Sequence, residues 1–463
     1  MAEHYDIVVV GSGPAGKRAA VQSAKADKRV LVVERGRKIG GVSVHTGTIP
    51  SKTLRETALN LSGVRERMFY GRSYRVKQDI SAEDLNARLM KTLSYEVEVL
   101  EHQFLRNRVE TAAGRARFFS PTELAIETPE GDTHIVTAER VLLAVGTKPH
   151  RPAHVPFDDD RVVDCDAILE LKRLPRSMIV VGAGVIGVEY ATIFAALDVR
   201  VTLIEPRDEI LTFIDREIVS HFRTSMIEKG VTLRFGAKAE TIERRGDEVV
   251  VGLSGGRQAR AEMLLYAAGR VGATDDLGLE HVGLTPDDRG RIKVDPATFQ
   301  TDNPRIYAAG DVIGFPSLAS TSMEQGRIAA CCAFDLPAPP PPDFFPYGIY
   351  AVPEISTCGM SEEEVRERGI PYETGVARFE ETSRGHIMGV DRGLMKLIFS
   401  IKTQRLLGVH IIGEGATELV HIGQAVMNLK GDLDYFIKNT FNYPTLAEAY
   451  KIAALDAYNR MPR

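Results

Sequence analysis

Tryptophan is absent from the 463-residue sequence, and cysteine occurs only four times. The cysteines form no C-x-x-C pair and no metal-type spacing, which argues against a disulfide scaffold or a thiolate metal site: Cys165, Cys331, Cys332 and Cys358. Two of them lie in the apolar run RIAACCAF, where packing is the favoured role and a redox pair is the alternative. We expect no bound metal.

Long apolar runs and an excess of positive charge are also missing. No stretch reaches the ~18 consecutive apolar residues of a membrane-spanning helix. The net charge of −5 gives no reason to expect nucleic acid as a partner. The N-terminal MAEHYDIVVVGSG lacks a positive segment and a small-residue cleavage site, so it predicts a strand and not a signal peptide. We therefore expect a cytoplasmic protein.

Two segments of the chain resemble each other. Residues 5–34 contain YDIVVV, GSGPAG, an alanine-rich stretch and RVLVVE, and residues 178–205 contain MIVV, GAGVIG, VEYATIFAAL and VRVTLIE. Each pattern predicts a strand, a glycine turn, a helix and a second strand, with the strands buried on both faces of a parallel sheet. The second helix is expected to carry one amphipathic face, formed by Ile186, Tyr190, Ile193, Phe194 and Leu197.

Each repeat carries a G-x-G-x-x-G turn and an acidic residue at the end of its second strand. The glycines are Gly11, Gly13 and Gly16 in the first repeat, and Gly182, Gly184 and Gly187 in the second. Glu34 and Glu205 each follow the first glycine by 23 residues. Glycine lets the backbone approach a pyrophosphate, the helix N-terminus attracts the phosphates, and the acid accepts hydrogen bonds from a ribose. The two fingerprints predict two dinucleotide sites.

The rest of the chain mixes helices and strands. Residues 61–69 and 82–105 have helical patterns, and the stretch from Val109 to Val141 alternates as strands do. The proline-rich run PAPPPPDFFP, residues 337–346, predicts a stiff polyproline linker at a domain boundary, with an SH3-type ligand as the alternative. The residues after it alternate strands and helices, which indicates a separate α+β domain.

Several motifs in order along the whole chain resemble those of the dihydrolipoamide dehydrogenase and glutathione reductase group, the class-I pyridine nucleotide-disulfide oxidoreductases. They are GSGPAG with Glu34, GG…GTIPSK (40–52), LLAVGTKP (142–149), GAGVIGVE (182–189), IYAAGDVIG (306–314), PEIS (353–356) and NYPTLAEAY (442–450). The resemblance implies an α/β fold with two Rossmann-like dinucleotide-binding domains and a C-terminal α+β dimerisation domain. A homodimer or a larger homo-oligomer is expected.

The resemblance also implies domain boundaries and cofactors. Residues 1–149 would bind FAD, 150–272 would bind NAD(P), 273–340 would form a central domain that completes the FAD site, and 341–463 would form the interface. The residues expected to bind FAD are Gly11, Gly13, Gly16, Glu34, Arg35, Gly41, Ser43, Lys52, Ala116, Gly146, Asp311 and Ala319. Those expected at the nucleotide pocket are Gly182, Gly184, Gly187, Glu205, Gly269 and Arg270.

The same resemblance implies a catalytic pair. Lys52 of the IPSK motif would lie by the flavin N5 and pair with Glu189 of the second fingerprint. A cation there would stabilise negative charge on a reduced flavin. The alternative for Lys52 is an ordinary lysine on a helix surface. His45 could be mistaken for a catalytic base, and we expect a structural or flavin-packing role instead.

The sequence departs from the group at the dithiol. Disulfide reductases of this kind carry two cysteines ahead of IPSK, where this chain has Ser43 and Thr48. A hydroxyl cannot form a disulfide, so electrons cannot reach a dithiol substrate by that route. The His–Glu pair that protonates the dithiol is also incomplete, because Asn442 stands in the histidine position while Glu448 remains. The half-reaction with a dithiol is therefore expected to be missing.

What remains resembles the soluble pyridine nucleotide transhydrogenases, in which hydride passes from NADPH through FAD to NAD⁺ in ping-pong steps. A diaphorase or quinone reductase and a non-catalytic flavoprotein assembly partner are the alternatives. One residue fits less well, because Glu205 favours a free ribose 2′-hydroxyl and repels the 2′-phosphate of NADPH. Arg207 or Arg200 is the candidate partner for that phosphate.

Overall fold

The computed structural model describes residues 3–71, 73–338, 340–390 and 392–462. The chain divides into two compact units, each made of three segments. The first unit holds residues 1–53, 86–150 and 269–342, and the second holds 54–85, 151–268 and 343–463. The last boundary falls within the proline-rich run 337–346, whose described residues form no helix or strand. The finer division into four domains stays a prediction.

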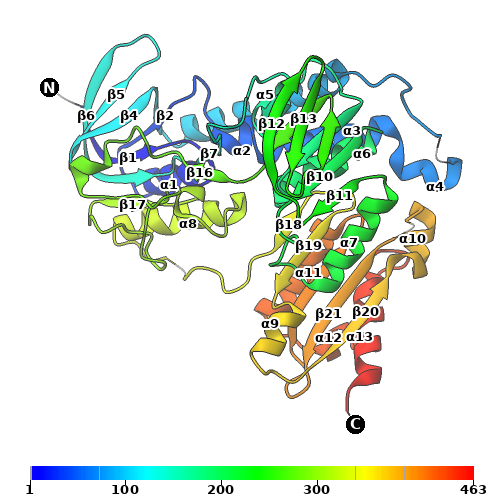
Figure 1. Ribbon diagram of the computed structural model, residues 1–463. Coiled ribbons are helices and arrows are strands. Elements are labelled where there is room, and N and C mark those ends of the chain that lie inside the picture. Colours follow the sequence, from blue (N-terminus) through cyan, green and yellow to red (C-terminus); the bar gives the residue numbers. More distant parts are fainter. Residues whose placement is uncertain (1–2, 72, 339, 391, 463) are drawn as a thin grey trace. The chain divides into compact units, whose positions relative to one another are not determined.

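The first repeat forms the centre of a seven-stranded sheet in the first unit (Figure 1). Its strands follow the spatial order β3 (Glu110–Ala113), β2 (Val30–Glu34), β1 (Glu3–Val10), β6 (Thr133–Leu143), β5 (Glu123–Glu127) and β4 (Arg115–Ser120), with β17 (Ile306–Ala308) also beside β6. Strands β3, β2, β1, β6 and β17 pair in parallel, and the β4–β5 hairpin pairs antiparallel with the start of β6. The parallel sheet predicted for the repeat is confirmed.

Helices and one short ribbon complete this unit. They are α1 (Pro14–Ala24), α2 (Gly41–His45), the start of α3 (Thr48–Ser62), most of α5 (Ala82–Arg106), α8 (Ala319–Ala333) and the antiparallel pair of β7 (Thr147–Pro149) with β16 (Arg270–Gly272). Helices α1 and α8 pack closely, since a Cβ on Gly326 of α8 would lie 2.1 Å from the carbonyl oxygen of Ala15. The sequence pattern predicted the helices of α1 and α5, but not α2 or α3.

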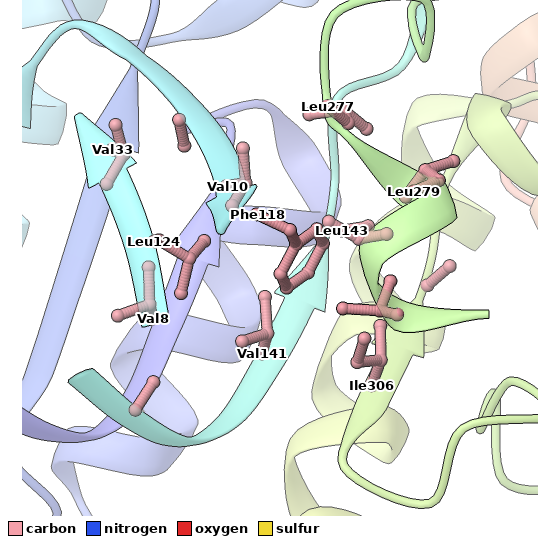
Figure 2. Close-up of a cluster of buried hydrophobic side chains, with 14 of the residues drawn as sticks. Val8, Val10, Val33, Phe118, Leu124, Val141, Leu143, Leu277, Leu279 and Ile306 are labelled. Carbon is pink, nitrogen blue, oxygen red and sulfur yellow. The ribbon is translucent and has the colours of Figure 1, made fainter. Parts of the chain in front are cut away.

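Both faces of the sheet are buried, and successive side chains of β1 alternate between them. Val8 and Val10 belong to a cluster that includes Phe118 of the hairpin (Figure 2). Ile7 and Val9 belong to a second cluster, which includes alanines of α1 and α8. A strand with apolar contacts on both sides needs no polar alternation, which explains its continuous apolar sequence.

The second repeat forms a parallel five-stranded sheet in the second unit. The order is β11 (Thr232–Phe235), β10 (Arg200–Glu205), β9 (Ser177–Val181), β15 (Met263–Tyr266) and β8 (Val162–Asp164). An antiparallel sheet of β12 (Ala239–Arg245), β13 (Glu248–Leu253) and β14 (Gln258–Ala261) packs against it through Val249 and Val251, and α6 (Val185–Ala196) and α7 (Arg216–Glu228) are its helices. The predicted second nucleotide-binding fold is confirmed.

The rest of the second unit is an antiparallel sheet with helices, as predicted for the residues after the proline-rich run. Its strands are β18 (Tyr347–Ile349), β19 (Ile355–Gly359), β22 (Leu406–Ile412), β21 (Leu394–Ser400) and β20 (Tyr372–Arg378) in spatial order. Its helices are α9 (Glu362–Glu367), α10 (Ser383–Met388), α11 (Ala416–Asn428), α12 (Leu433–Lys438) and α13 (Glu448–Arg460). Helices α11, α12 and α13 share one apolar core with this sheet.

Two sequence-based expectations about helices are wrong. Helix α6 has no amphipathic face, because every residue from Gly187 to Ala196 is buried, and Leu197 lies beyond its end. It packs on the parallel sheet and also binds the segment 350–352, so even its polar residues are covered. The helix expected over residues 61–69 is broken at Gly63, which has a φ of +63°. Helix α3 ends before this glycine, and the short α4 (Arg67–Tyr70) lies after it.

No helix in the described part of the chain is long and apolar enough to cross a membrane. Among the same residues, no group of His, Cys, Asp or Glu side chains could hold a metal ion.

A buried charge cluster in the second unit joins helix α7, which belongs to the parallel sheet, to strand β21 of the C-terminal sheet. The Nζ of Lys396, on β21, lies 2.6 Å from Glu362, 3.0 Å from Glu217 and 3.1 Å from Asp215. Asp215 is the N-cap of α7, and its side chain accepts the backbone N–H of Glu217. Burial opposes the charge on Lys396, but hydrogen bonds to Glu362 and the other carboxylates outweigh it and raise the pKa of the amine. The cluster therefore fixes α7 against β21.

Replacing Lys396 with methionine should destabilise the second unit strongly. The substitution leaves the fully buried carboxylate of Asp215 without its cation, which costs about 3–5 kcal/mol. We expect the melting temperature, followed by circular dichroism, to fall by several degrees. Lys438→Met is the control, since its ion pair with Asp434 on α12 is exposed and should not change the melting temperature. Equal melting curves for the two variants would contradict the claim that the Lys396 cluster stabilises the second unit.

Candidate functional site

The first glycine fingerprint forms the turn between β1 and α1. Gly11 has a φ of +100°, and a Cβ there would lie 2.4 Å from the carbonyl oxygen of Ala144. A Cβ on Gly16 would lie 1.9 Å from the carbonyl oxygen of Gly11. Gly13, the N-cap of α1, would meet no protein atom with a Cβ. The turn itself thus requires Gly11 and Gly16, whereas Gly13 leaves space open beside the helix N-terminus.

A cavity of about 460 Å³ lies at this turn, within the size range of small-molecule sites. Most residues predicted to bind FAD line it: Gly11, Gly13, Glu34, Arg35, Gly41, Ser43, Ala116, Gly146, Asp311 and Ala319. Gly16 packs behind the turn instead of lining the cavity. Lys52 is not among the lining residues either, and its Nζ donates a hydrogen bond to the Ser51 hydroxyl at 3.3 Å.

Glu34 is held at the cavity by the backbone of the turn. Its carboxylate accepts the N–H of Ser12 at 3.0 Å and the N–H of Gly36 at 3.2 Å. The Ser12 hydroxyl also donates to Glu34 and accepts the N–H of Gly40 at 2.7 Å. Ser12 therefore ties the fingerprint turn to the start of α2. The sequence analysis missed Ser12 because it occupies the position between two glycines at which the G-x-G motif specifies no residue type.

The walls of the cavity combine helix N-termini with a partly buried acid, Asp311. Helices α1 and α8 both begin at the cavity, and helix N-termini stabilise anions such as phosphates. Burial raises the pKa of Asp311, and this rise is opposed by the charge of Arg270 and a hydrogen bond with Ser322. Arg270 is itself fixed by donating Nε to the Thr147 hydroxyl and Nη2 to the Thr147 carbonyl oxygen, both at 2.9 Å.

Two further lining residues have defined partners. Arg35 lies 3.6 Å from Asp276, which also lines the cavity and which sequence reasoning missed. His45 donates Nε2–H to the carbonyl oxygen of Ile39 at 2.9 Å, so this nitrogen is engaged in a backbone contact. Ser43 and Thr48, which stand where a dithiol would be, both line the cavity. Together these contacts shape the loop between β2 and α3.

The second fingerprint repeats the geometry of the first in the second unit. Gly182 has a φ of +100°, and a Cβ on Gly187 would lie 1.8 Å from the Gly182 carbonyl oxygen. Gly184 caps α6 and has open space at its Cβ position. Glu205 accepts the N–H of Ala183 at 2.8 Å, as Glu34 accepts that of Ser12. The two acids therefore occupy equivalent places beside equivalent turns.

Glu205 differs from Glu34 in one respect, because a guanidinium is bound to it. Arg207 donates Nε to Oε1 at 2.7 Å and Nη2 to Oε2 at 3.2 Å. The side chain of Glu205 is 4% exposed, whereas the side chain of Arg207 is 58% exposed. Burial opposes ionisation of Glu205, but the hydrogen bonds from Arg207 and Ala183 outweigh it and lower the pKa. The corresponding residue of the first fingerprint is Gly36, which offers only its backbone N–H.

The remaining predicted residues are distributed between the units. Gly269 and Arg270 belong to the first unit, where the Gly269 carbonyl oxygen accepts the N–H of His150 at 3.1 Å. Their role at the nucleotide pocket stays a prediction. Lys52 belongs to the first unit and Glu189 to the second, so their pairing also stays a prediction.

The C-terminal motif has an exposed amide and a partly buried acid. Asn442 is exposed, and its carbonyl oxygen accepts the Thr445 hydroxyl at 2.7 Å. Glu448 begins α13, and its buried Oε2 has no hydrogen-bond partner within the described residues. Within the described residues of the second unit, Asn442 and Glu448 therefore do not form a pair that could transfer a proton.

Comparison with known proteins agrees with this geometry. Residues 5–326 match the pyridine nucleotide-disulphide oxidoreductase family, and residues 345–454 match its dimerisation domain. The chain belongs to the pyridine nucleotide-disulphide oxidoreductase family.

Close relatives and solved structures extend over nearly the full length. The chain is 50% identical to a soluble pyridine nucleotide transhydrogenase of Mycobacterium bovis, covering 99% of this chain and 98% of the relative. It is 41% identical to the enzyme of that name from Escherichia coli, with the same coverage. Among solved structures it resembles LpdA from Mycobacterium tuberculosis (TM-score 0.89, 26% identity, 98% and 99% covered). It also resembles the flavoprotein disulfide reductase RclA from Escherichia coli (TM-score 0.87, 27% identity, 97% and 99% covered).

FAD is the cofactor of this oxidoreductase family, and the cavity of the first unit fits it. The open Cβ position of Gly13 and the two helix N-termini suit a pyrophosphate, and the carboxylate of Glu34 suits a ribose, as predicted for FAD. Asp311, a partly buried acid that lines the cavity, is compatible with its predicted contact to the ribityl hydroxyls. The dimerisation-domain match indicates assembly with a second copy of the chain.

The cysteines lie away from this cavity. None of the four is among its lining residues, and none of the four forms a disulfide. Burial raises the pKa of both Cys331 and Cys332, which disfavours the reactive thiolate. Both residues lie on α8, and Cys331 is fully buried. These contacts favour the packing role over a redox pair.

Two glycine variants of the first turn should behave differently. Gly16→Ala would drive a Cβ into the Gly11 carbonyl oxygen, so we expect little folded, flavin-bearing protein. Gly13→Ala has room for its Cβ and should fold with a nearly unchanged melting temperature, but it should retain less FAD after gel filtration. FAD absorbance per protein and circular dichroism report the two effects. Full FAD content in Gly16→Ala would contradict this account of the turn.

Proposed function

We propose that the chain catalyses hydride transfer from NADPH to NAD⁺ through bound FAD, in ping-pong steps and without a redox-active disulfide. The observation that carries the proposal is the pair of hydroxyls, Ser43 and Thr48, that line the FAD cavity where dithiol reductases carry cysteines. The names of the relatives that are 50% and 41% identical over nearly the whole chain support the same reaction. The active form would be a cytoplasmic homodimer.

The absence of a thiol at the cavity limits which acceptors the enzyme can use. A dithiol substrate exchanges with a protein disulfide, and neither Ser43 nor Thr48 can take part in that exchange. Asn442 has no titrating proton near neutral pH, so it cannot serve as the acid–base group of such a reaction. Electrons that enter from one nucleotide therefore have to leave to a second acceptor that needs no thiol.

Bound FAD would supply a two-electron carrier that takes hydride from one nicotinamide and returns it to another. The protein contributes binding and electrostatics. Lys52 would place a cation beside the flavin and stabilise negative charge there, with Glu189 holding the lysine in position. One nicotinamide site at the second fingerprint is sufficient, since the first nucleotide leaves before the second binds.

Acceptance of both NADH and NADPH would depend on the pair formed by Glu205 and Arg207. With NAD(H), Glu205 would accept hydrogen bonds from the ribose hydroxyls while keeping its contact with the Ala183 N–H. With NADP(H), the exposed guanidinium of Arg207 would turn from Glu205 to the 2′-phosphate, which it can bind with the same two donors. Arg200 starts β10 whereas Glu205 ends it, so Arg200 lies too far along the strand for this role.

The first testable consequence concerns nucleotide preference. Arg207→Ala should raise KM for NADPH roughly 10- to 100-fold, the range expected for losing a charge-assisted hydrogen bond. KM for NADH should hardly change, because the carboxylate of Glu205 is still available to the ribose. Steady-state kinetics with each nucleotide and a common acceptor measure both values. Arg200→Ala is the matched control and should change neither.

The complementary variant is Glu205→Ala. It removes the ribose acceptor and the repulsion of the phosphate, so the preference should shift toward NADPH. An unchanged preference in both Arg207→Ala and Glu205→Ala would contradict the proposed dual site.

The second consequence concerns the reaction itself. Purified holoenzyme mixed with NADPH and thionicotinamide-NAD⁺ should form reduced thio-NAD, with parallel double-reciprocal plots for the two substrates. Dihydrolipoamide should give no turnover. Fast quinone reduction without thio-NAD reduction would instead identify a diaphorase, and dihydrolipoamide turnover would contradict the argument from Ser43 and Thr48.

A further inference from the structure

Glu189, the acid that would pair with Lys52, is bound to a segment far away in the sequence. It lies on α6, is 3% exposed, and accepts the backbone N–H of Tyr350 through Oε1 at 2.8 Å. One turn later, the Thr192 hydroxyl accepts the backbone N–H of Val352 at 3.0 Å. A backbone N–H donor fixes the orientation of the carboxylate that accepts it. The position of residues 350–352 therefore bears directly on the orientation of the Glu189 carboxylate.

A buried arginine holds the same segment from another helix. Arg55 lies on α3 and is 2% exposed. It donates Nε to the carbonyl oxygen of Ala351 at 3.0 Å, and its Nη2 lies 3.1 Å from Glu354. Its Nη1 donates to Glu56 at 2.6 Å. Each of the three guanidinium nitrogens thus has a partner. Two of these partners, Ala351 and Glu354, belong to the segment whose Tyr350 N–H binds Glu189.

Glu354 is fixed in turn by the helix that follows the antiparallel sheet. It is 7% exposed, and its second oxygen accepts the Thr417 hydroxyl at 2.8 Å and the Thr417 N–H at 3.2 Å, in the first turn of α11. The carbonyl oxygen of Glu354 accepts the N–H of Gly413 at 2.9 Å. The segment 350–354 is therefore clamped between α3, α6 and α11, with Arg55 as its central donor.

Stability alone does not explain a buried arginine at this place. Burying a guanidinium and a carboxylate costs desolvation energy, and apolar residues of the same volume often stabilise a core equally well. The planar guanidinium fork binds a backbone carbonyl and a carboxylate three residues apart at the same time, and it does so in a fixed geometry that a lysine ammonium lacks. Arg55 also follows Lys52 by one turn of α3, so the same helix carries both residues.

We propose that Arg55 is a positioning residue that orients Glu189, by holding the segment 350–354 so that the Tyr350 N–H reaches the carboxylate. This inference rests on the proposed function, in which Glu189 acts beside the flavin. Glu354 is the second member of the clamp, since it fixes the guanidinium from the side of α11. Neither Arg55 nor Glu354 is assigned contact with substrate or cofactor.

Hydrogen exchange on the holoenzyme tests the clamp without using activity. In Arg55→Met, amides of the peptide containing residues 350–352 should exchange roughly tenfold faster than in the parent protein. Arg65→Met is the matched control, because Arg65 shares Glu56 with Arg55 but ion-pairs with Glu414 instead of Glu354. It should leave that peptide unchanged. Unchanged exchange in Arg55→Met would overturn the proposal. Glu354→Gln removes the other partner with little change of shape, and it replaces Arg55→Met if that variant does not fold.

Stopped-flow kinetics then test whether the clamp acts through Glu189. Arg55→Met should slow the flavin half-reaction with NADH roughly tenfold while the dissociation constant of NADH stays unchanged. In a Glu189→Gln background the same substitution should have no further effect, because the carboxylate that it positions is gone. An equal slowing in both backgrounds would overturn the proposal and leave only a structural role. A normal half-reaction in Glu189→Gln alone would instead overturn the role of Glu189 in the proposed function, and the inference with it.

Discussion

Both nucleotide-binding turns depend on one interaction, in which an acid at the end of the second strand accepts the N–H of the residue between the first two glycines. Glu34 binds Ser12 in this way, and Glu205 binds Ala183. The contact requires strand, turn and helix to be in register, so it fixes the helix N-terminus together with the acid that is expected to accept the ribose. The cavity of the first unit and the expected specificity of the second are consequences of that single arrangement.

The two turns differ in what else touches the acid. The first has Gly36 and leaves the carboxylate open to a ribose, whereas the second has Arg207, whose guanidinium neutralises Glu205. We expect the first arrangement to suit an unphosphorylated ribose, and the second to suit a ribose with or without a 2′-phosphate. Together with hydroxyls in place of a dithiol, this contrast favours a reaction that begins and ends with nicotinamide nucleotides.

Local patterns predicted most of the fold, and long-range packing explains where prediction failed. The glycine spacing and apolar runs identified both parallel sheets, since these depend on neighbouring residues. The burial of α6 on all sides could not be foreseen, because it depends on a segment more than 150 residues away that binds Glu189 and Thr192. Gly63 was visible in the sequence, but its left-handed φ was not. The ion partners of Lys396 and Arg55 were likewise hidden, since they come from different elements.

An anaerobic reductive titration of the holoenzyme, followed by addition of NAD⁺, tests the central claim most directly. Without a dithiol, FAD is the sole redox centre, so about two electrons per FAD should complete its reduction and NAD⁺ should then recover about one NADH per FAD. Uptake of about four electrons per FAD, or failure of NAD⁺ to recover them, would contradict the account.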